Sequence, residues 1–134
     1  PYRASDHDPV VIEINGVTPV VTTTKVIEDI DKVRRWFWWF WYKPQNTFAV
    51  NVPENATSLK VTLAGGTGDA DLYLRQGKKP NKRKFDCRSV NNGNDEVCEI
   101  ELPEAGQWFI SVKGKRLFFD VTMTIETKAL ESLN

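Results

Sequence analysis

Much of the chain alternates between apolar and polar residues with a period of two, the spacing expected of strands that bury one face. Leu59, Val61 and Leu63 share one face of such a run, and Lys60 and Thr62 separate them. Further runs of strand-like residues follow the same logic along the chain. They span residues 47–52, 71–75, 97–102, 107–112 and 118–125.

Turn-forming residues separate these runs, because Gly, Pro, Asn and Asp favour tight turns. They lie at residues 53–55, 65–68, 77–80 and 103–106 and at Gly114. Short strands with such punctuation predict an all-β fold, an antiparallel β-sandwich or barrel. Residues 27–35 could instead form two helical turns, because Asp29 and Asp31 precede basic residues, although β-branched and aromatic neighbours oppose a helix.

The composition is that of an ordinary globular domain. The 134 residues fit one domain, with 40% hydrophobic and 27% charged residues. Eighteen basic and eighteen acidic residues cancel, so only a local patch could attract nucleic acid or an anionic membrane. The longest apolar run, residues 36–42, is far shorter than the roughly 20 residues of a membrane-spanning helix, so we expect no transmembrane segment. The chain starts at Pro1 without signal-peptide features, and we expect it to be a fragment.

Two cysteines flank a polar segment. Residues 91–95 read as a turn, which would bring Cys87 and Cys98 side by side on neighbouring strands. A disulfide is one reading of this spacing, and two free buried thiols are the other. A zinc site is disfavoured, because two cysteines without further ligands fall short of four. A disulfide would indicate an oxidising compartment.

The aromatic run at residues 36–42 leaves neither face of a strand polar. Some of its side chains therefore need a second surface, such as a polymer, a partner, a lipid interface or another copy of the chain. A strand buried on both sides, or one that covers a neighbouring catalytic domain, is the simpler explanation. The candidate docking residues in this run are Trp36, Trp38, Trp39 and Trp41.

Two charged segments are further candidate sites. A basic loop could bind phosphates in a salt-dependent manner, or it could simply be a solvated loop. Its cations are Lys78, Lys79, Lys82, Arg83 and Lys84. Asp69 and Asp71 offer two carboxylates for calcium, although this ion takes six to eight oxygens, and Asp71 could equally hydrogen-bond the turn backbone.

The motif SDHDPV at residues 5–10 resembles the closing motif of the endonuclease/exonuclease/phosphatase superfamily, which precedes the last core strand. The resemblance implies that His7 is a general base and that Asp6 orients its imidazole. A parent enzyme of this kind would use Mg or Mn. The rest of that machinery would lie upstream of residue 5, so we expect this fragment to be inactive and to need no cofactor. The alternative is that His7 is active within the intact parent, a metal-dependent extracellular phosphodiesterase or nuclease.

Residues 46–127 resemble the bacterial pre-peptidase C-terminal (PPC) domain, a β-sandwich attached to secreted proteases and other hydrolases. The matching positions are residues 52–55 and 63–75, Gly77, Pro80, and residues 85–88, 93–98 and 105–109. The resemblance implies a jelly-roll-like antiparallel sandwich. It also implies that Cys87 and Cys98 pair, because the cysteines at these positions do so in that family.

These resemblances predict four segments. Residues 1–15 would be the remnant of a catalytic domain, 16–45 a linker and entering strand with the aromatic run, 46–127 the sandwich, and 128–134 a tail. We expect a non-catalytic C-terminal accessory domain of a secreted, extracellular bacterial nuclease. It would aid secretion, folding or substrate docking, and it could be removed on maturation. The expected partners are the parent catalytic domain, DNA through the basic loop, and a second copy through the aromatic run.

Overall fold

The computed structural model describes residues 19–32, 35–37, 40–42 and 46–131. Every strand pairing in this part of the chain is antiparallel. Its elements are β1 (Val20–Lys32), β2 (Arg35–Phe37), β3 (Phe40–Tyr42), β4 (Thr47–Val52), β5 (Ala56–Ala64), β6 (Thr67–Gln76), β7 (Cys87–Ser89), β8 (Glu96–Glu101) and β9 (Gly106–Leu130). The described residues include no helix that is long and apolar enough to span a membrane.

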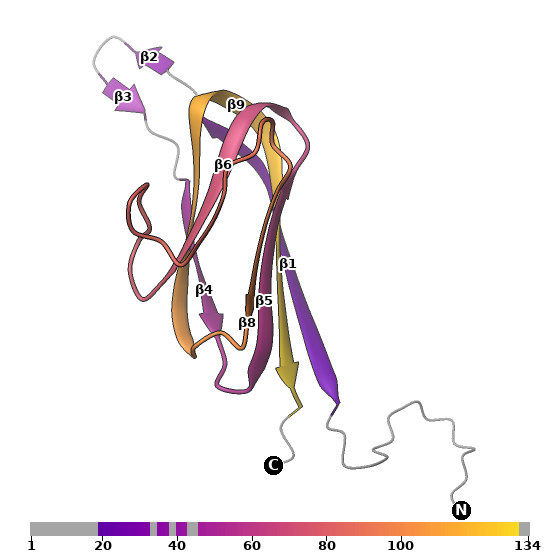
Figure 1. The fold of residues 1–134 in the computed structure, drawn as a ribbon. Coiled ribbons are helices and arrows are strands. Elements are labelled where there is room, and N and C mark those ends of the chain that lie inside the picture. The colour runs from indigo at the N-terminus through magenta and orange to yellow at the C-terminus, as the bar shows by residue number, and fades with distance from the viewer. Residues whose placement is uncertain (1–18, 33–34, 38–39, 43–45, 132–134) are drawn as a thin grey trace, which may run out of the picture.

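The long strand β9 belongs to both layers of the fold. Its residues 106–114 pair with β4 and β6, and its residues 118–130 pair with β1 and β5. Strand β7 lies outside β6, and β8 lies outside β5. The first sheet is therefore β4–β9–β6–β7 and the second is β1–β9–β5–β8, with β9 bending from one into the other (Figure 1). The predicted all-β antiparallel sandwich is confirmed.

The core lies between the two sheets and consists of the residues that alternate inward. Leu59, Val61 and Leu63 of β5 are fully buried, as the period-two pattern predicts. Leu72 and Leu74 of β6 are equally inaccessible in the opposite sheet. Burying a side chain of this size contributes about 1.5–3 kcal/mol, so these paired faces hold the layers together.

The bend of the β1–β9 ribbon coincides with irregular pairing. The register between the two strands shifts between Ile27 and Ile30. Asp29 on one strand and Asp120 on the other adopt left-handed backbone conformations, with φ of 57° and 56°. Such β-bulges increase local twist and bend a strand, and Asp tolerates this backbone region better than most residues.

The disulfide between Cys87 and Cys98 is present, with 6.1 Å between the two Cα atoms. Its placement differs from the predicted hairpin. Strand β7 pairs with β6 and β8 pairs with β5, and no ladder joins β7 to β8 in the described chain. The bond therefore links the edges of the two sheets instead of two strands of one sheet. Closing a loop of this length contributes about 2–3 kcal/mol in the chain-entropy account.

Three sequence-based expectations need correction. The segments at 107–112 and 118–125 form a single strand, β9, and Gly114 is buried within it instead of forming a turn. The possible helical turns at 27–35 are absent from the described residues of that segment, because β1 runs to Lys32. The sandwich is also longer than expected: β1 pairs along β9 within the segment expected to be a linker and entering strand, and β9 includes residues 128–130, which were expected to belong to a tail.

The aromatic run does not form a single strand. Strands β2 and β3 pair as a small antiparallel hairpin, with Trp36 opposite Trp41. This hairpin lies beyond the end of the sandwich at which β9 bends (Figure 1). Trp38 and Trp39 lie outside the described residues, so docking or self-association through this run stays a prediction.

The turn between β5 and β6 packs so closely against β9 that a side chain at Gly66 would clash with it. Gly66 has φ of +68°, and a Cβ there would lie 2.0 Å from the carbonyl oxygen of Phe119. Gly77 has a similar φ of +79°, but a Cβ there would meet no atom within 4 Å. Gly77→Ala should therefore lower the free energy of unfolding by only about 1–2 kcal/mol, the cost of placing a residue with a Cβ in the left-handed backbone region. Gly66→Ala should lower the free energy of unfolding by at least about 2 kcal/mol more, because its Cβ would clash with the carbonyl oxygen of Phe119.

Urea denaturation of the two variants measures this difference in the free energy of unfolding. Gly77→Ala is the matched control, because it carries the same backbone penalty without the close approach. Equal destabilisation by both substitutions would contradict the described packing of the turn against β9.

Candidate functional site

The basic loop connects β6 to β7 and projects from the body of the sandwich (Figure 1). Its five cations fall within seven consecutive residues, and all five are exposed. They are Lys78, Lys79, Lys82, Arg83 and Lys84. Among the described residues, no carboxylate forms an ion pair with these cations; the described Lys128–Glu126 pair lies elsewhere, on β9. Their charge is therefore available to a ligand.

An internal turn gives the loop a defined shape. The side-chain oxygen of Asn81 accepts hydrogen bonds from the backbone N–H groups of Arg83 and Lys84, both at 2.8 Å. The backbone N–H of Asn81 donates to the carbonyl of Lys84 at 2.9 Å. Asn side chains commonly stabilise turns in this way. Pro80, in the same loop, is buried and anchors the loop to the sandwich.

Ring contacts fix the end of the loop that leads into β7. Phe85 packs edge-on against Tyr73, with the ring centroids 5.9 Å apart. The guanidinium of Arg88 lies 5.2 Å from the centre of the Phe85 ring, within the range of a cation–π contact. The backbone N–H of Asp86 donates to Leu74 at 2.7 Å. These contacts fix the conformation of the loop that carries the cations.

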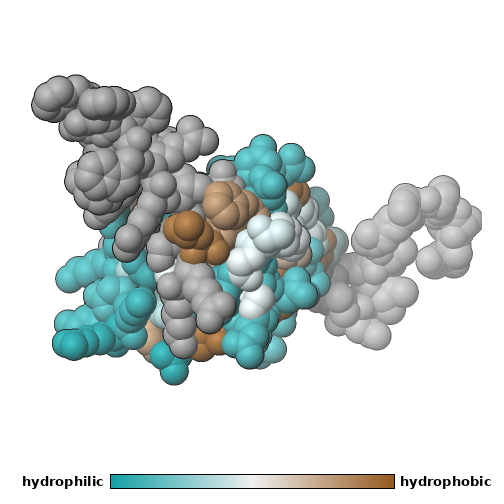
Figure 2. Space-filling model, turned by 90° about the horizontal axis from the view of Figure 1, so that it is seen from above, coloured by the Kyte–Doolittle hydropathy of each residue, from teal (hydrophilic) through white to brown (hydrophobic). Residues whose placement is uncertain are grey.

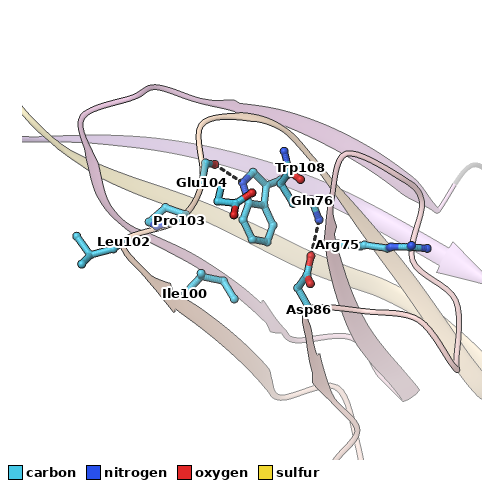
Figure 3. A pocket seen from close by; sticks show the side chains of 8 residues that line it. All are labelled: Arg75, Gln76, Asp86, Ile100, Leu102, Pro103, Glu104 and Trp108. Atoms are coloured by element: carbon cyan, nitrogen blue, oxygen red, sulfur yellow. Dashed lines mark hydrogen bonds between the residues drawn. The ribbon is translucent and has the colours of Figure 1, made fainter.

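A cavity of about 480 Å³ lies at the foot of this loop (Figure 3). The carboxylate of Asp86 accepts the backbone N–H of Gln76 at its rim, at 2.7 Å. The indole N–H of Trp108 donates to the carbonyl of Glu104 at 2.8 Å. Arg75 also lines the cavity and adds a positive charge next to the basic loop. The remaining lining residues are Ile100, Leu102 and Pro103.

Carboxylates gather near the opposite end of β6. Asp71 is buried, and one oxygen of Asp69 is buried without a hydrogen-bond partner in the described structure. A cation could satisfy that oxygen. However, no group of three or more His, Cys, Asp or Glu side chains suited to a metal ion occurs among the described residues. Calcium takes six to eight oxygen ligands, so a calcium site at Asp69 and Asp71 stays a prediction.

Asn94 performs a structural role that the sequence reading missed. Its side-chain oxygen accepts the backbone N–H of Ala70 at 2.7 Å, and its amide donates to the carbonyl of Gly65 at 2.9 Å. The side chain therefore connects the loop before β8 to the β5–β6 turn at Gly65 and to strand β6 at Ala70. The sequence did not predict the burial of Asn94, because a polar residue in a turn-like segment is normally exposed.

Glu96 is a fully buried carboxylate at the edge of the second sheet. Its two oxygens accept the backbone N–H of Asn91 at 2.5 and 3.0 Å. Burial raises the pKa of Glu96 above its usual range, hydrogen bonds from Ser89 and Asn91 oppose that shift, and the charges of Asp71 and Asp69 add to it. The period-two phase of Glu96 with Cys98 and Ile100 could have identified it as an inward-facing position.

An apolar patch lies at the end of the sandwich where β9 bends. Leu117 and Phe119 of β9 are 42% and 41% exposed. The view onto this end shows hydrophobic atoms on the surface (Figure 2). Asp6 and His7 also lie outside the described residues, so their proposed catalytic roles stay predictions.

Comparison with known proteins identifies the family. The sequence profile described as "Bacterial pre-peptidase C-terminal domain" matches residues 45–114. The chain is 34% identical to a neutral protease of Vibrio proteolyticus over 58% of its length. It is 36% identical to a zinc metalloprotease of Helicobacter pylori over 60%, and 41% identical to alkaline serine exoprotease A of Vibrio alginolyticus over 46%.

The chain spans only a small part of these relatives. The matched segments cover 13%, 30% and 11% of the three proteases, respectively. One relative is named a metalloprotease and another a serine protease, so the shared segment accompanies different catalytic chemistries. The family match begins at residue 45 and does not include the motif at residues 5–10.

The buried carboxylate predicts a pH dependence of stability. Because the folded-state pKa of Glu96 lies above its ordinary value of 4.5, the folded protein binds more protons than the unfolded chain between the two values. The contribution of this group is therefore most favourable below about pH 4.5 and is lost as the pH rises through the folded-state pKa. Glu96→Gln should remove this decrease in the free energy of unfolding with rising pH, as measured by urea denaturation from pH 4 to pH 8.

Glu99→Gln is the control, because Glu99 is exposed on the same strand. It should leave the pH dependence of the wild type unchanged. Parallel curves for the wild type and Glu96→Gln would show that Glu96 is not the titrating group.

Proposed function

Because the chain belongs to the bacterial pre-peptidase C-terminal domain family, we propose that it is a non-catalytic accessory domain of a secreted bacterial hydrolase. The observation that carries this proposal is the pairing of one domain with unlike enzymes. A metalloprotease and a serine protease both contain a segment similar to this chain. A module retained beside different catalytic centres serves a need that those enzymes share, such as export, folding or substrate docking.

The location outside the cytoplasm rests on chemistry and on relatives. A disulfide that links the two sheets persists in an oxidising compartment and is rare in the cytosol. One relative is named an exoprotease. Both observations support an extracellular protein. Removal of the domain on maturation stays a prediction.

The parent enzyme is proposed from a separate observation. The motif at residues 5–10 resembles the end of a metal-dependent nuclease domain, whereas the relatives named above are proteases. The nuclease assignment therefore rests on the motif alone. In the intact parent, His7 would act as the general base and Asp6 would orient it, with Mg or Mn as the metal.

Among the shared needs, the described surface favours substrate docking. The basic loop presents five exposed cations, for which the described residues supply no ion-pair partner, and Arg75 lies nearby among the residues that line the adjacent cavity. A nucleic acid backbone is the polymer that such a cluster suits best, because each phosphate contact releases counterions. We propose that this loop holds DNA for the parent enzyme, through phosphates and without base recognition.

The non-catalytic assignment is tested by incubating the 134-residue chain with supercoiled plasmid DNA and Mg²⁺. No nicked or linear product should form, because a general base without its metal-binding carboxylates provides little stabilisation of the transition state. His7→Ala should give the same baseline. Plasmid cleavage that disappears in His7→Ala would overturn the proposal.

The docking role is tested by fluorescence anisotropy with labelled double-stranded DNA at low salt. The wild type should bind with a dissociation constant typical of non-specific contacts, about 10⁻⁴–10⁻⁶ M, and should weaken steeply as salt rises. The double variant Lys82→Glu/Arg83→Glu should bind at least ~10-fold more weakly, with a salt slope smaller by about two.

The control separates the loop from net charge. Lys60→Glu/Lys128→Glu changes the total charge by the same amount but alters the outer face of the second sheet, on β5 and β9. Binding should be nearly unchanged in this control. Equal losses in both double variants would show that DNA responds to overall charge and not to the loop.

A further inference from the structure

Strand β1 has a free edge. In the described chain it pairs with β9 on one side and with no strand on the other. The backbone N–H of Glu131 donates to the carbonyl of Pro19, and the register continues with Val21 opposite Ala129. Because antiparallel residues alternate between facing the partner strand and facing away, the odd-numbered residues face β9. The N–H and C=O groups of four residues therefore point outward: Val20, Thr22, Thr24 and Val26.

This edge has few of the features that usually prevent strands from adding to one another. Proteins protect edges with prolines, charges, bulges or short strands. The free edge of β4 is short and is followed by Pro53, whereas β1 has 13 residues and its bulge lies at Asp29, beyond this stretch. Between residues 20 and 26 the only charged residue is Lys25. Val20 and Val26 are 51% and 53% exposed.

We propose that two copies of this chain associate by antiparallel pairing of their β1 edges at residues 20–26. Hydrogen bonds form only where outward-facing residues of one copy meet outward-facing residues of the other. The register that places Val20 opposite Val26 also places Thr22 opposite Thr24, and it satisfies this condition around a two-fold axis at Thr23. The partner is thus a second copy, through an isologous interface.

Side chains favour the same register. Val20 lies opposite Leu130 on β9, and Leu130 is 39% exposed. Pairing Val20 with Val26 of the second copy extends this contact into an apolar row across the interface, and the symmetry creates the row twice. Shifting the register by two residues would place Val20 opposite Glu28 in one direction and opposite Thr24 in the other, so either shift loses the valine–valine pair. Cross-strand apolar pairs of this kind stabilise sheets.

The test uses two double variants of the full 134-residue chain in sedimentation velocity over a range of concentrations. Val20→Lys/Val26→Lys places like charges opposite each other in the proposed register and should raise the dimer dissociation constant at least ~10-fold. Val20→Lys/Val26→Glu replaces the same valines but places opposite charges together, and it should dimerise within a few-fold of the wild type. Circular dichroism checks that both variants fold.

Each outcome decides the proposal. A wild-type chain that remains monomeric at millimolar concentration overturns it, and would mean that the edge is covered or otherwise blocked. Association that is equal in both double variants also overturns it, and would point to a different surface such as the β2–β3 hairpin. DNA binding through the basic loop does not involve β1, so its result is independent of this one.

Discussion

The structure depends on one strand that is shared by two sheets. Strand β9 pairs on both sides along most of its length, with β4 and β6 before its bend and with β1 and β5 after it. Because β9 contributes one segment to each sheet, neither sheet can complete its inter-strand hydrogen bonds unless the other forms as well. The bulges at Asp29 and Asp120 make this possible, since a regular strand could not turn between layers within a few residues.

The basic loop and a group of carboxylates lie toward opposite ends of β6. The basic loop and the cavity lie where β6 ends, whereas Asp69, Asp71 and Glu96 lie near its start. The overall charge of zero therefore does not mean that charge is spread evenly, because five cations fall within residues 78–84. In Figure 1 the basic loop projects from the side of the sandwich, whereas β1 begins and β9 ends at the bottom of the view.

Much of the fold could be predicted from the sequence, because alternation reports directly on burial. The inward face of Leu59, Val61 and Leu63 is correct, and the family resemblance gave the pairing of Cys87 with Cys98. The continuity of β9 could not be predicted, because Gly114 reads as a turn and only the surrounding sheet keeps it extended. An entering strand was expected within residues 16–45, but the length of β1 and its pairing with β9 could not be predicted, because its mixed composition also suits a helix or a linker.

The candidate site shows a similar division. The run of cations can be read from the sequence, but the turn at Asn81 and the Phe85–Tyr73 contact that fix the loop depend on tertiary structure.

The adjacency of Val20 and Leu130 has a mechanical consequence. A pull that separated these neighbouring positions would load the β1–β9 ladder one rung at a time, as a zipper opens, and would not shear all its bonds together. The inter-sheet disulfide lies at the far edge, so it would keep the remaining layers joined after that peeling.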